Sequence, residues 1–328
     1  MTRIVSGIQP SGELHLGNYL GALRHWVSLQ AEAECFFMVA DLHAITAPQN
    51  PKELRERTVD TAALLLAVGI DPERSVFFLQ SMVPQHAELA WVLNCFTAMG
   101  ELRRMVQFKD KSARGSESEA TAGLFVYPVL QAADILLYQA DRVPIGEDQR
   151  QHLELTRTLA QRFNTRYPGT FKIPEPLIAP EGARIMDLHD PRMKMSKSAK
   201  SPSGLIRLTD SPEVIRSKIS AATTDSGREI LSSPQKPGIS NLIAMYSIVS
   251  GTSVEITKNT FSGKTYAQFK NTLADKLAEY MRPIRERYEQ LRQERAFVEG
   301  LLTRGSARAA AVAEQTRTTV FERVGIGM

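Results

Sequence analysis

Short apolar runs alternate with longer amphipathic stretches along the first half of the chain. The runs at residues 3–8, 35–40 and 75–80 have the length of strands that are buried on both faces. Apolar residues at helical spacing predict helices at residues 18–28, 51–68, 86–99, 127–139 and 150–164. Strands that alternate with helices indicate βαβ units and therefore a parallel sheet.

The second part of the chain is dominated by helical patterns. From residue 211 onward, apolar spacing predicts helices at residues 213–221, 240–250, 266–291 and 295–323. Two segments read as connections, because residues 109–122 are low in hydrophobicity and residues 167–176 are rich in proline and glycine. We therefore expect an α/β part followed by a helical part.

Charge and cysteine usage narrow the class of protein. Residues 1–204 carry 22 basic and 23 acidic side chains, whereas residues 205–328 carry 18 and 13. The basic excess fits either a surface that meets a polyanion or an ordinary solvated helical surface.

No apolar run is long enough to cross a membrane, and no signal-peptide pattern is present. Cys35 and Cys95 lie in apolar contexts, so we expect buried, reduced thiols in a cytoplasmic protein without a metal site.

A glycine-rich segment follows the first predicted strand and opens the next helix. It contains Gly7, Gly12 and Gly17 and ends with His15-Leu-Gly-Asn18. Backbone N–H groups at a helix N-terminus favour an anion, and His15 and Asn18 add polar side chains three residues apart. The same glycines would suit a β-to-α turn that binds no ligand. The spacing is not Gly-x-Gly-x-x-Gly, which disfavours a nicotinamide cofactor.

Two lysines and two serines lie together in the segment Lys194-Met195-Ser196-Lys197-Ser198. Lysines on a closing loop can stabilise the negative charge that develops when a phosphoryl group is attacked. The serine hydroxyls can donate to phosphate oxygens. A solvated surface loop is the alternative interpretation.

One predicted helix is almost entirely apolar but carries polar side chains along one face. Tyr127, Gln131, Asp134 and Tyr138 are separated by four, three and four residues. A buried carboxylate is costly unless it is paired. Asp134 must therefore accept hydrogen bonds, either from a ligand or from a neighbouring protein donor.

These segments together resemble a known family of enzymes. The loops that contain His15 and Lys194 match the two signatures of class I aminoacyl-tRNA synthetases, with His-Leu-Gly-Asn in place of the usual His-Ile-Gly-His. Nearly the whole chain is similar to bacterial tryptophanyl-tRNA synthetases. The segments that carry this similarity are residues 6–12, 127–138, 143–157, 182–186 and 237–242.

The resemblance implies a domain organisation and a reaction. A doubly wound, Rossmann-like catalytic domain would occupy residues 1–204, a helical tRNA anticodon-binding domain residues 205–293, and residues 294–328 would pack back on the catalytic domain. The enzyme would activate L-tryptophan with ATP, release pyrophosphate and transfer tryptophan to tRNA(Trp), as a homodimer. Mg²⁺ would travel with the ATP phosphates. A tyrosyl-tRNA synthetase and a paralogue that charges no tRNA are the alternatives.

The resemblance also assigns roles near ATP. His15, Asn18, Lys194 and Lys197 are expected to be catalytic, and Lys111 to lie near the phosphates. The expected ATP-binding residues are Gln9, Pro10, Ser11, Gly17, Asn18, Gly146, Glu147, Asp148, Ile185, Lys194, Met195, Ser196, Lys197 and Ser198. Without the resemblance, the acidic turn at residues 146–149 is explained equally well as the N-terminal cap of the helix predicted from residue 150.

For tryptophan, the resemblance implies that Asp134 accepts the indole N–H. Tyr127, Gln131, Gln149 and His43 would complete the pocket. Such an acceptor rejects rings that lack the N–H, because the carboxylate would then stay unpaired. Members of the family commonly have Met where this chain has Gln131.

The lysine loop generates a first prediction. Replacing Lys197 with Ala removes charge that is needed mainly in the transition state. The kcat for adenylate formation should therefore fall about 100-fold, which corresponds to a rise of about 3 kcal/mol in the activation free energy, while ATP binding changes little. Single-turnover adenylation measures this. A Lys197→Ala rate within about threefold of the original rate would contradict the assigned role.

Overall fold

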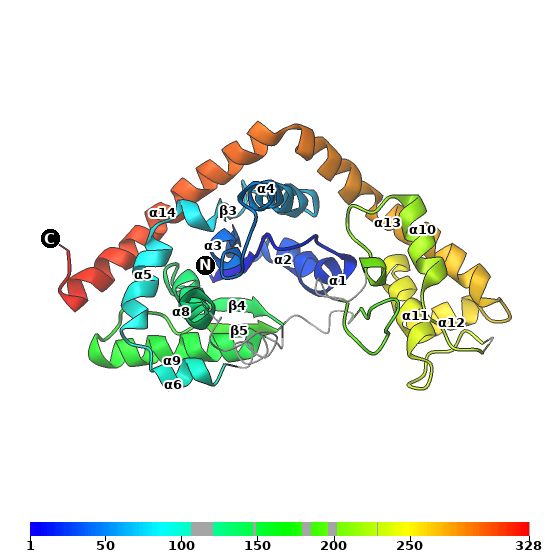
Figure 1. Ribbon diagram of the computed structural model, residues 1–328, viewed down its shortest axis with the longest axis horizontal. Helices are drawn as coiled ribbons and strands as arrows, with labels where there is room; N and C mark the ends of the chain where they lie inside the picture. The colour runs from blue at the N-terminus through cyan, green and yellow to red at the C-terminus, as the bar shows by residue number, and fades with distance from the viewer. Residues whose placement is uncertain (106–120, 147–148, 179–184, 196–201, 228, 328) are drawn as a thin grey trace.

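A computed structural model of the chain describes residues 1–105, 121–146, 149–178, 185–195, 202–227 and 229–327. A parallel sheet of five strands forms the centre of its N-terminal part (Figure 1). The strands are β1 (Arg3–Ile8), β2 (Glu34–Val39), β3 (Val76–Leu79), β4 (Arg142–Ile145) and β5 (Glu175–Ile178). Their order is β3-β2-β1-β4-β5, so the chain winds outward from β1 first on one side and then on the other. This is the doubly wound α/β fold that we expected.

The strands predicted from apolar runs are buried on both faces of the sheet. In β2, Cys35, Phe37 and Val39 belong to one hydrophobic cluster, whereas Phe36 and Met38 belong to another. Successive side chains of a strand point to opposite faces, so a strand that is covered on both sides needs an unbroken apolar sequence. The run at residues 35–40 has this property.

The strands β4 and β5 lie where we expected no strand, and β5 overlaps the segment expected to be turns. Pro144 in β4 and Pro176 in β5 have no N–H to donate to a neighbouring strand. Because β5 is an edge strand, a missing donor on its open side costs no inter-strand bond. The proline-rich composition of residues 167–176 is therefore compatible with a strand at this place in the sheet.

Helices cover both faces of the sheet (Figure 1). The helical elements are α1 (Leu16–Asn18), the π-helical turn η1 (Tyr19–Leu23), α2 (Arg24–Leu29), α3 (Asp41–Ala44), α4 (Pro51–Ala67), the 3-10 turn η2 (Gln80–Met82), α5 (Gln85–Asn94), α6 (Met99–Arg103), α8 (Ala122–Leu136) and α9 (Arg150–Arg166). The helices expected at residues 18–28, 51–68 and 150–164 agree with these elements to within a few residues.

The helix expected at residues 86–99 is shorter in the structure. It ends at Asn94, and α6 begins before Gly100, so Gly100 lies inside a helix and does not close one. Cys95 directly follows α5 and is exposed, although we expected both thiols to be buried. The expectation holds for Cys35, whose place in the central sheet buries it; burial raises its pKa to about 11, with a smaller contribution from the nearby Glu34 carboxylate.

The apolar helix expected at residues 127–139 starts five residues earlier. α8 begins at Ala122, where the Thr121 hydroxyl accepts a backbone N–H of the first turn. Pro128 lies inside the helix, and burial of the apolar side chains around it outweighs the hydrogen bond that proline cannot donate. Three residues beyond the helix end, Gln139 adopts the left-handed conformation with φ 51°.

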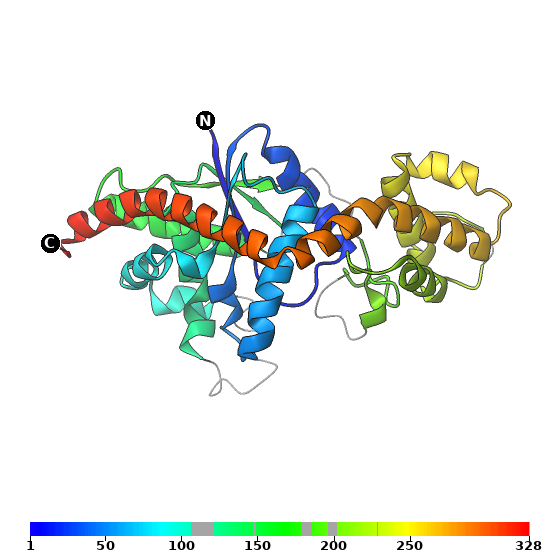
Figure 2. The same cartoon turned by 90° about the horizontal axis from the view of Figure 1, so that it is seen from above.

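The second part of the chain is helical, as the apolar spacing predicts. The elements are the short 3-10 turn η5 (Pro202–Gly204), α10 (Pro212–Ala221), α11 (Pro237–Ser250), α12 (Val254–Thr260), α13 (Tyr266–Gln293) and α14 (Arg295–Val324). Helices α10 to α13 form a unit beside the sheet, which we call the helical unit (Figures 1 and 2). α12 was not expected, because its seven residues are too short for a clear periodicity.

The last helix runs from the helical unit back across the sheet (Figure 2). α14 packs on β3, where the Leu79 N–H donates to the Ser306 hydroxyl at 3.2 Å. A side chain at Gly305 would overlap the carbonyl oxygen of Phe77, so this close approach requires glycine. At the start of α14, Arg295 pairs with Glu56 of α4 at 2.7 Å. No helix within the described ranges is long and apolar enough to span a membrane.

Candidate functional site

The expected site residues lie after the carboxyl ends of parallel strands. The glycine-rich loop follows β1, His43 follows β2, and Gly146 and Gln149 follow β4. Gln80, which was not expected, follows β3. The order of strands reverses between β1 and β4, and ligands of doubly wound folds bind at such a reversal. The sheet therefore collects residues from four separate parts of the sequence at one edge.

The glycine-rich loop ends in a structured turn. His15 is the N-cap of α1, and its backbone N–H donates to Asn18 Oδ1 at 3.2 Å. The His15 side chain is buried, with 2% exposed. In this geometry the Asn18 side-chain oxygen holds the turn. Of the other expected residues of this loop, Gln9, Ser11 and Gly17 are half-buried and Pro10 is buried.

The lysine loop begins in a short antiparallel stem. The Met195 N–H donates to the Ile185 carbonyl at 3.0 Å, and Met186 pairs with Lys194 as an isolated bridge. Ile185 and Met195 are buried, whereas Lys194 is exposed. The stem thus anchors two apolar side chains and leaves the first lysine of the motif accessible. The Ile185 carbonyl, expected near adenine, already accepts one hydrogen bond from Met195.

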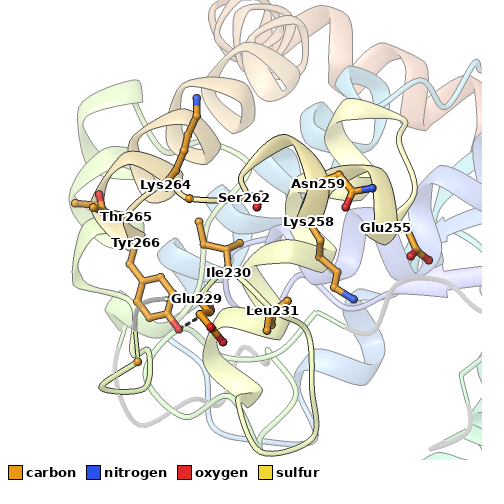
Figure 3. A pocket seen from close by; sticks show the side chains of 13 residues that line it. Glu229, Ile230, Leu231, Glu255, Lys258, Asn259, Ser262, Lys264, Thr265 and Tyr266 are labelled. Atoms are coloured by element: carbon orange, nitrogen blue, oxygen red, sulfur yellow. Dashed lines mark hydrogen bonds between the residues drawn. The ribbon is translucent and has the colours of Figure 1, made fainter.

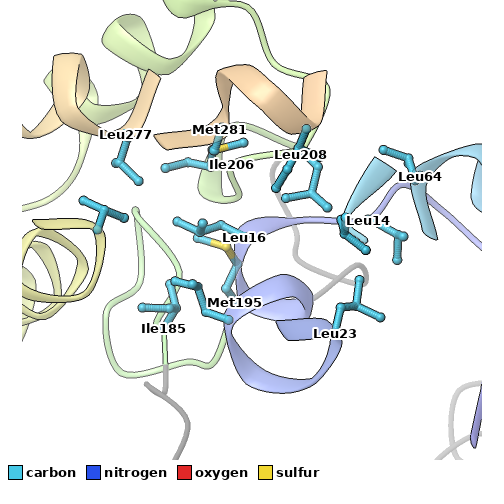
Figure 4. Packing of buried hydrophobic residues seen from close by; sticks show 14 of the residues in the cluster. Leu14, Leu16, Leu23, Leu64, Ile185, Met195, Ile206, Leu208, Leu277 and Met281 are labelled. Atoms are coloured by element: carbon cyan, nitrogen blue, oxygen red, sulfur yellow. The ribbon is translucent and has the colours of Figure 1, made fainter. Parts of the chain in front are cut away.

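The two loops meet in space although they are far apart in the sequence. A Cβ atom at Gly17 would lie 3.5 Å from Met195 Cβ and 3.1 Å from the His15 ring. The Leu16 N–H donates to the Ile206 carbonyl at 2.8 Å, which ties the glycine-rich loop to the segment after the lysine loop. Figure 4 shows Leu16, Ile185, Met195 and Ile206 packed together. Residue 17 therefore lies where the two loops are in van der Waals contact, and a side chain there would crowd the His15 ring.

Asp134 is the centre of a buried polar network. Its Oδ1 accepts hydrogen bonds from Gln80 Nε2 at 2.8 Å and from His86 Nδ1 at 2.6 Å. Its Oδ2 accepts a hydrogen bond from His43 Nε2 at 2.7 Å. Burial opposes ionisation, but the charges and hydrogen bonds of His43 and His86 outweigh it and hold the pKa of Asp134 well below its ordinary value. The carboxylate is ionised, so it only accepts.

This network continues to Tyr138. An ionised carboxylate only accepts, so His86 donates to it through Nδ1, and His86 Nε2 lies 2.8 Å from the Tyr138 hydroxyl oxygen. Burial and the charge on Asp134 raise the pKa of Tyr138, which keeps the hydroxyl protonated. Gln80 is fixed in turn by the Leu42 N–H, which donates to its Oε1 at 3.1 Å. Every member of the network therefore has a defined orientation.

A second network joins the other residues expected at tryptophan. Gln149 Oε1 accepts from His152 Nδ1 at 3.0 Å and from Gln131 Nε2 at 3.4 Å. His152 Nε2 lies 3.0 Å from the Tyr127 hydroxyl, and burial raises the pKa of Tyr127 to about 12. The ring of Tyr127 meets the His43 ring edge-on, with centroids 6.3 Å apart. All five residues expected at tryptophan therefore lie in two adjoining networks.

Three residues of these networks were not anticipated from the sequence. Gln80 and His86 lie at and after the end of β3, and His152 lies in the first turn of α9. All three are almost fully buried. Polar residues in otherwise apolar segments were the available signal, but Gln80 and His86 lie 54 and 48 residues from Asp134, and His152 lies 25 residues from Tyr127.

Several expected site residues lie outside the described residues. These are Lys111, Glu147, Asp148, Ser196, Lys197 and Ser198. Across the residues that the structure does describe, no group of three or more His, Cys, Asp or Glu side chains could hold a metal ion.

A hollow of about 980 Å³ lies in the helical unit (Figure 3). It is lined by Gly227, Glu229, Ile230, Leu231, Glu255, Lys258, Asn259, Ser262, Gly263, Lys264, Thr265, Tyr266 and Ala267. The Tyr266 hydroxyl closes one side of it by donating to the Glu229 carbonyl at 3.0 Å. None of the residues expected at ATP or tryptophan lines this hollow, so it is separate from the site at the sheet edge.

The doubly wound sheet and the contact between its two loops define a class of protein. A family model described as "tRNA synthetases class I (W and Y)" matches residues 1–282, and the chain belongs to this family. It is 51% identical over 325 residues to "Tryptophan--tRNA ligase 2" of Streptomyces avermitilis, a match that covers 98% of this chain and 96% of that protein.

Two solved structures have the same fold over essentially the whole chain. Tryptophanyl-tRNA synthetase from Mycoplasma pneumoniae matches with a TM-score of 0.89 and 38% identity, covering 100% of this chain and 98% of that one. Tryptophanyl-tRNA synthetase from Campylobacter jejuni, "complexed with ADP and Tryptophane", matches with a TM-score of 0.87 and 34% identity, covering 99% and 100%.

Proposed function

We propose that the chain is a tryptophan–tRNA ligase. It activates L-tryptophan with ATP, which forms tryptophanyl-adenylate and releases pyrophosphate, and it then transfers tryptophan to the 3′ end of tRNA(Trp). The observation that carries this proposal is the contact between the His15 loop and the Lys194 loop at the carboxyl edge of the sheet. The relatives named for tryptophan favour this function over a tyrosyl-tRNA synthetase.

In the first step the tryptophan carboxylate attacks the α-phosphorus of ATP, and pyrophosphate leaves. We assign the glycine-rich loop, with Asn18 and the adjoining backbone, to the phosphates. Lys194 and Lys197 stabilise the charge that develops on the α-phosphate and the leaving pyrophosphate. Intact lysines in the motif speak against a paralogue that charges no tRNA. Mg²⁺ is held mainly by ATP oxygens and water, as is usual for this ion at phosphate sites.

We assign the Asp134 carboxylate to the indole N–H. Oδ1 accepts two hydrogen bonds from the protein, whereas Oδ2 accepts one, from His43. Each carboxylate oxygen has room for two donors, so Oδ2 has capacity for one further donor beyond those that the described residues supply. Tyr127, Gln131, Gln149 and His43 line the same region through the adjoining networks.

Replacing Asp134 with Ala tests the substrate assignment. The indole N–H would lose its acceptor, at a cost of roughly 1–3 kcal/mol or more for a charged partner, so the KM for tryptophan should rise at least about tenfold. The KM for ATP should stay near its original value. ATP–pyrophosphate exchange with each of the twenty amino acids measures both values, and the unaltered chain should respond to tryptophan alone.

Asp134→Asn is the matched control, because it preserves size and one acceptor oxygen and should give a partial loss. A mutant Asp134→Ala that selects tryptophan over tyrosine and phenylalanine as sharply as the unaltered chain would show a purely structural carboxylate. Exchange that depends on an amino acid other than tryptophan would contradict the proposed function itself.

We place the anticodon end of the tRNA on the helical unit and the 205–293 region around it. This region belongs to the part of the chain with 18 basic and 13 acidic side chains. Lys258 and Lys264 line the hollow in this unit together with the Asn259 amide, and Lys264 is exposed (Figure 3). Lysines attract the phosphates of a single-stranded loop, and an amide can pair with a base edge.

Reversing these two charges tests the assignment. The double variant Lys258→Glu, Lys264→Glu should weaken tRNA binding about tenfold or more and flatten its salt dependence, because phosphate contacts release fewer counterions. Tryptophan-dependent pyrophosphate exchange should not change. Lys52→Glu, an exposed charge reversal on α4, is the control and should leave tRNA affinity unaltered. Equal affinity for all three proteins would place the tRNA elsewhere.

We propose a homodimer in the cytoplasm, where ATP and tRNA are available. We expected the helices at residues 86–99 and 128–138 to form its interface. Residues 128–138 are almost entirely buried within the chain, so they are unsuitable. On α5, by contrast, Trp91 is 71% exposed, which suits a contact with a second copy. Sedimentation velocity at micromolar concentration should show a dimer, and a monomer would contradict this part of the proposal.

A further inference from the structure

The first turn of α11 carries a sequence motif that the proposed chemistry does not use. Residues 237–242 read Pro-Gly-Ile-Ser-Asn-Leu, with Pro237 at the first helical position. A side chain at Gly238 would overlap the Thr223 carbonyl oxygen, so glycine is needed for close approach of this segment. The turn therefore lies unusually near the backbone of its neighbours.

The Asn241 side chain in this turn makes two hydrogen bonds to the backbone of Met186. Its Oδ1 accepts the Met186 N–H at 2.9 Å, and its Nδ2 donates to the Met186 carbonyl at 3.0 Å. The side chain is buried, with 5% exposed. Only an amide offers a donor and an acceptor in this arrangement, so neither Asp nor Leu can replace both bonds.

Met186 lies in the stem of the lysine loop, so hydrogen bonds to its backbone bear on the position of that loop. It pairs with Lys194 in the stem of the lysine loop, and its neighbour Ile185 accepts the Met195 N–H. Ile185 and Met195 of the stem belong to one hydrophobic cluster with Leu16 of the glycine-rich loop and with Leu277 and Met281 of α13, and in Figure 4 Leu16 lies between the stem and α13. Apolar packing keeps the stem and the helical unit together but has little directional preference. The two hydrogen bonds of the amide are directional, so they also fix where the stem lies along the helical unit.

We propose that Asn241 is a positioning residue for adenylation. From the helical unit it holds the stem of the lysine loop, and the stem sets where Lys194 stands relative to the glycine-rich loop. Because these two hydrogen bonds come from the unit to which we assign the tRNA, Asn241 adds a directional link between the ATP site and the tRNA-binding unit. This inference rests on the proposed function of the lysine loop.

The neighbouring residue supplies a matched control. Ser240 also makes two hydrogen bonds to the backbone of one residue, because its hydroxyl accepts the Ser233 N–H at 2.9 Å and donates to the Ser233 carbonyl at 3.0 Å. Both residues therefore make two hydrogen bonds from one helical turn to the backbone of a loop. Ser233 lies in the segment that leads into α11 and carries none of the residues expected at ATP or tryptophan.

The experiment compares Asn241→Ala with Ser240→Ala in pyrophosphate exchange and single-turnover adenylation. For Asn241→Ala, kcat/KM for ATP should fall about tenfold or more, because the lysines lose their position in the transition state, while the KM for tryptophan stays within about twofold. Ser240→Ala should leave both values within about twofold, with a similar loss of thermal stability. Asn241→Asp, which keeps the size and loses the donor, should reproduce the ATP-specific loss.

Distinct results would overturn the inference. Equal kinetic losses in Asn241→Ala and Ser240→Ala, or losses shared equally by ATP and tryptophan, would show that Asn241 only stabilises the fold. If Asn241→Ala does not fold, unchanged ATP kinetics in Asn241→Asp would have the same meaning. Absence of tryptophan-dependent exchange in the unaltered chain would instead contradict the proposed function.

Discussion

The organisation of the amino-acid pocket depends on one buried charge, the Asp134 carboxylate. An ionised group without solvent must be paired, and removing even one partner from such a network is costly. The three donors come from the ends of β2 and β3 and from α5, so the sheet and two helices must be placed correctly for the charge to be tolerated. One oxygen keeps capacity for a further donor, and the proposed selectivity for indole follows from this.

The proposed ATP side of the site depends on a different interaction, which is backbone hydrogen bonding between segments that are distant in the sequence. The glycine-rich loop bonds to residues 206 and 208, and the stem of the lysine loop bonds within residues 185–195. Both sets of bonds lie between the sheet and the helical unit, and apolar side chains from each part fill the space between them. Asn241 adds a directional contact at this junction. The glycine-rich loop and the stem of the lysine loop thus lie at the junction between the sheet and the helical unit.

Sequence patterns predict the features that local physics determines. Strands buried on both faces need unbroken apolar runs, so β1, β2 and β3 could be predicted, as could the long helices α13 and α14. β4 and β5 could not, since proline disfavours a strand, and Pro176 of β5 is acceptable only because that strand lies at the edge of the sheet. The need of Asp134 for donors follows from its apolar surroundings, but His43, Gln80 and His86 as the donors require the tertiary fold, because nothing local links them. That Gly17 and Met195 belong to one site was likewise expected only through the family resemblance.

The central claim is that Asp134 selects its substrate through the indole N–H, and one titration tests it directly. Binding of L-tryptophan is compared with binding of 3-(3-benzothienyl)-L-alanine, in which sulfur replaces the N–H at nearly constant shape. The account predicts that the sulfur analogue binds at least about tenfold more weakly, because it leaves Oδ2 of a buried carboxylate without its further donor, and that this difference disappears in Asp134→Ala. Equal affinity of the unaltered chain for the two ligands would contradict the claim.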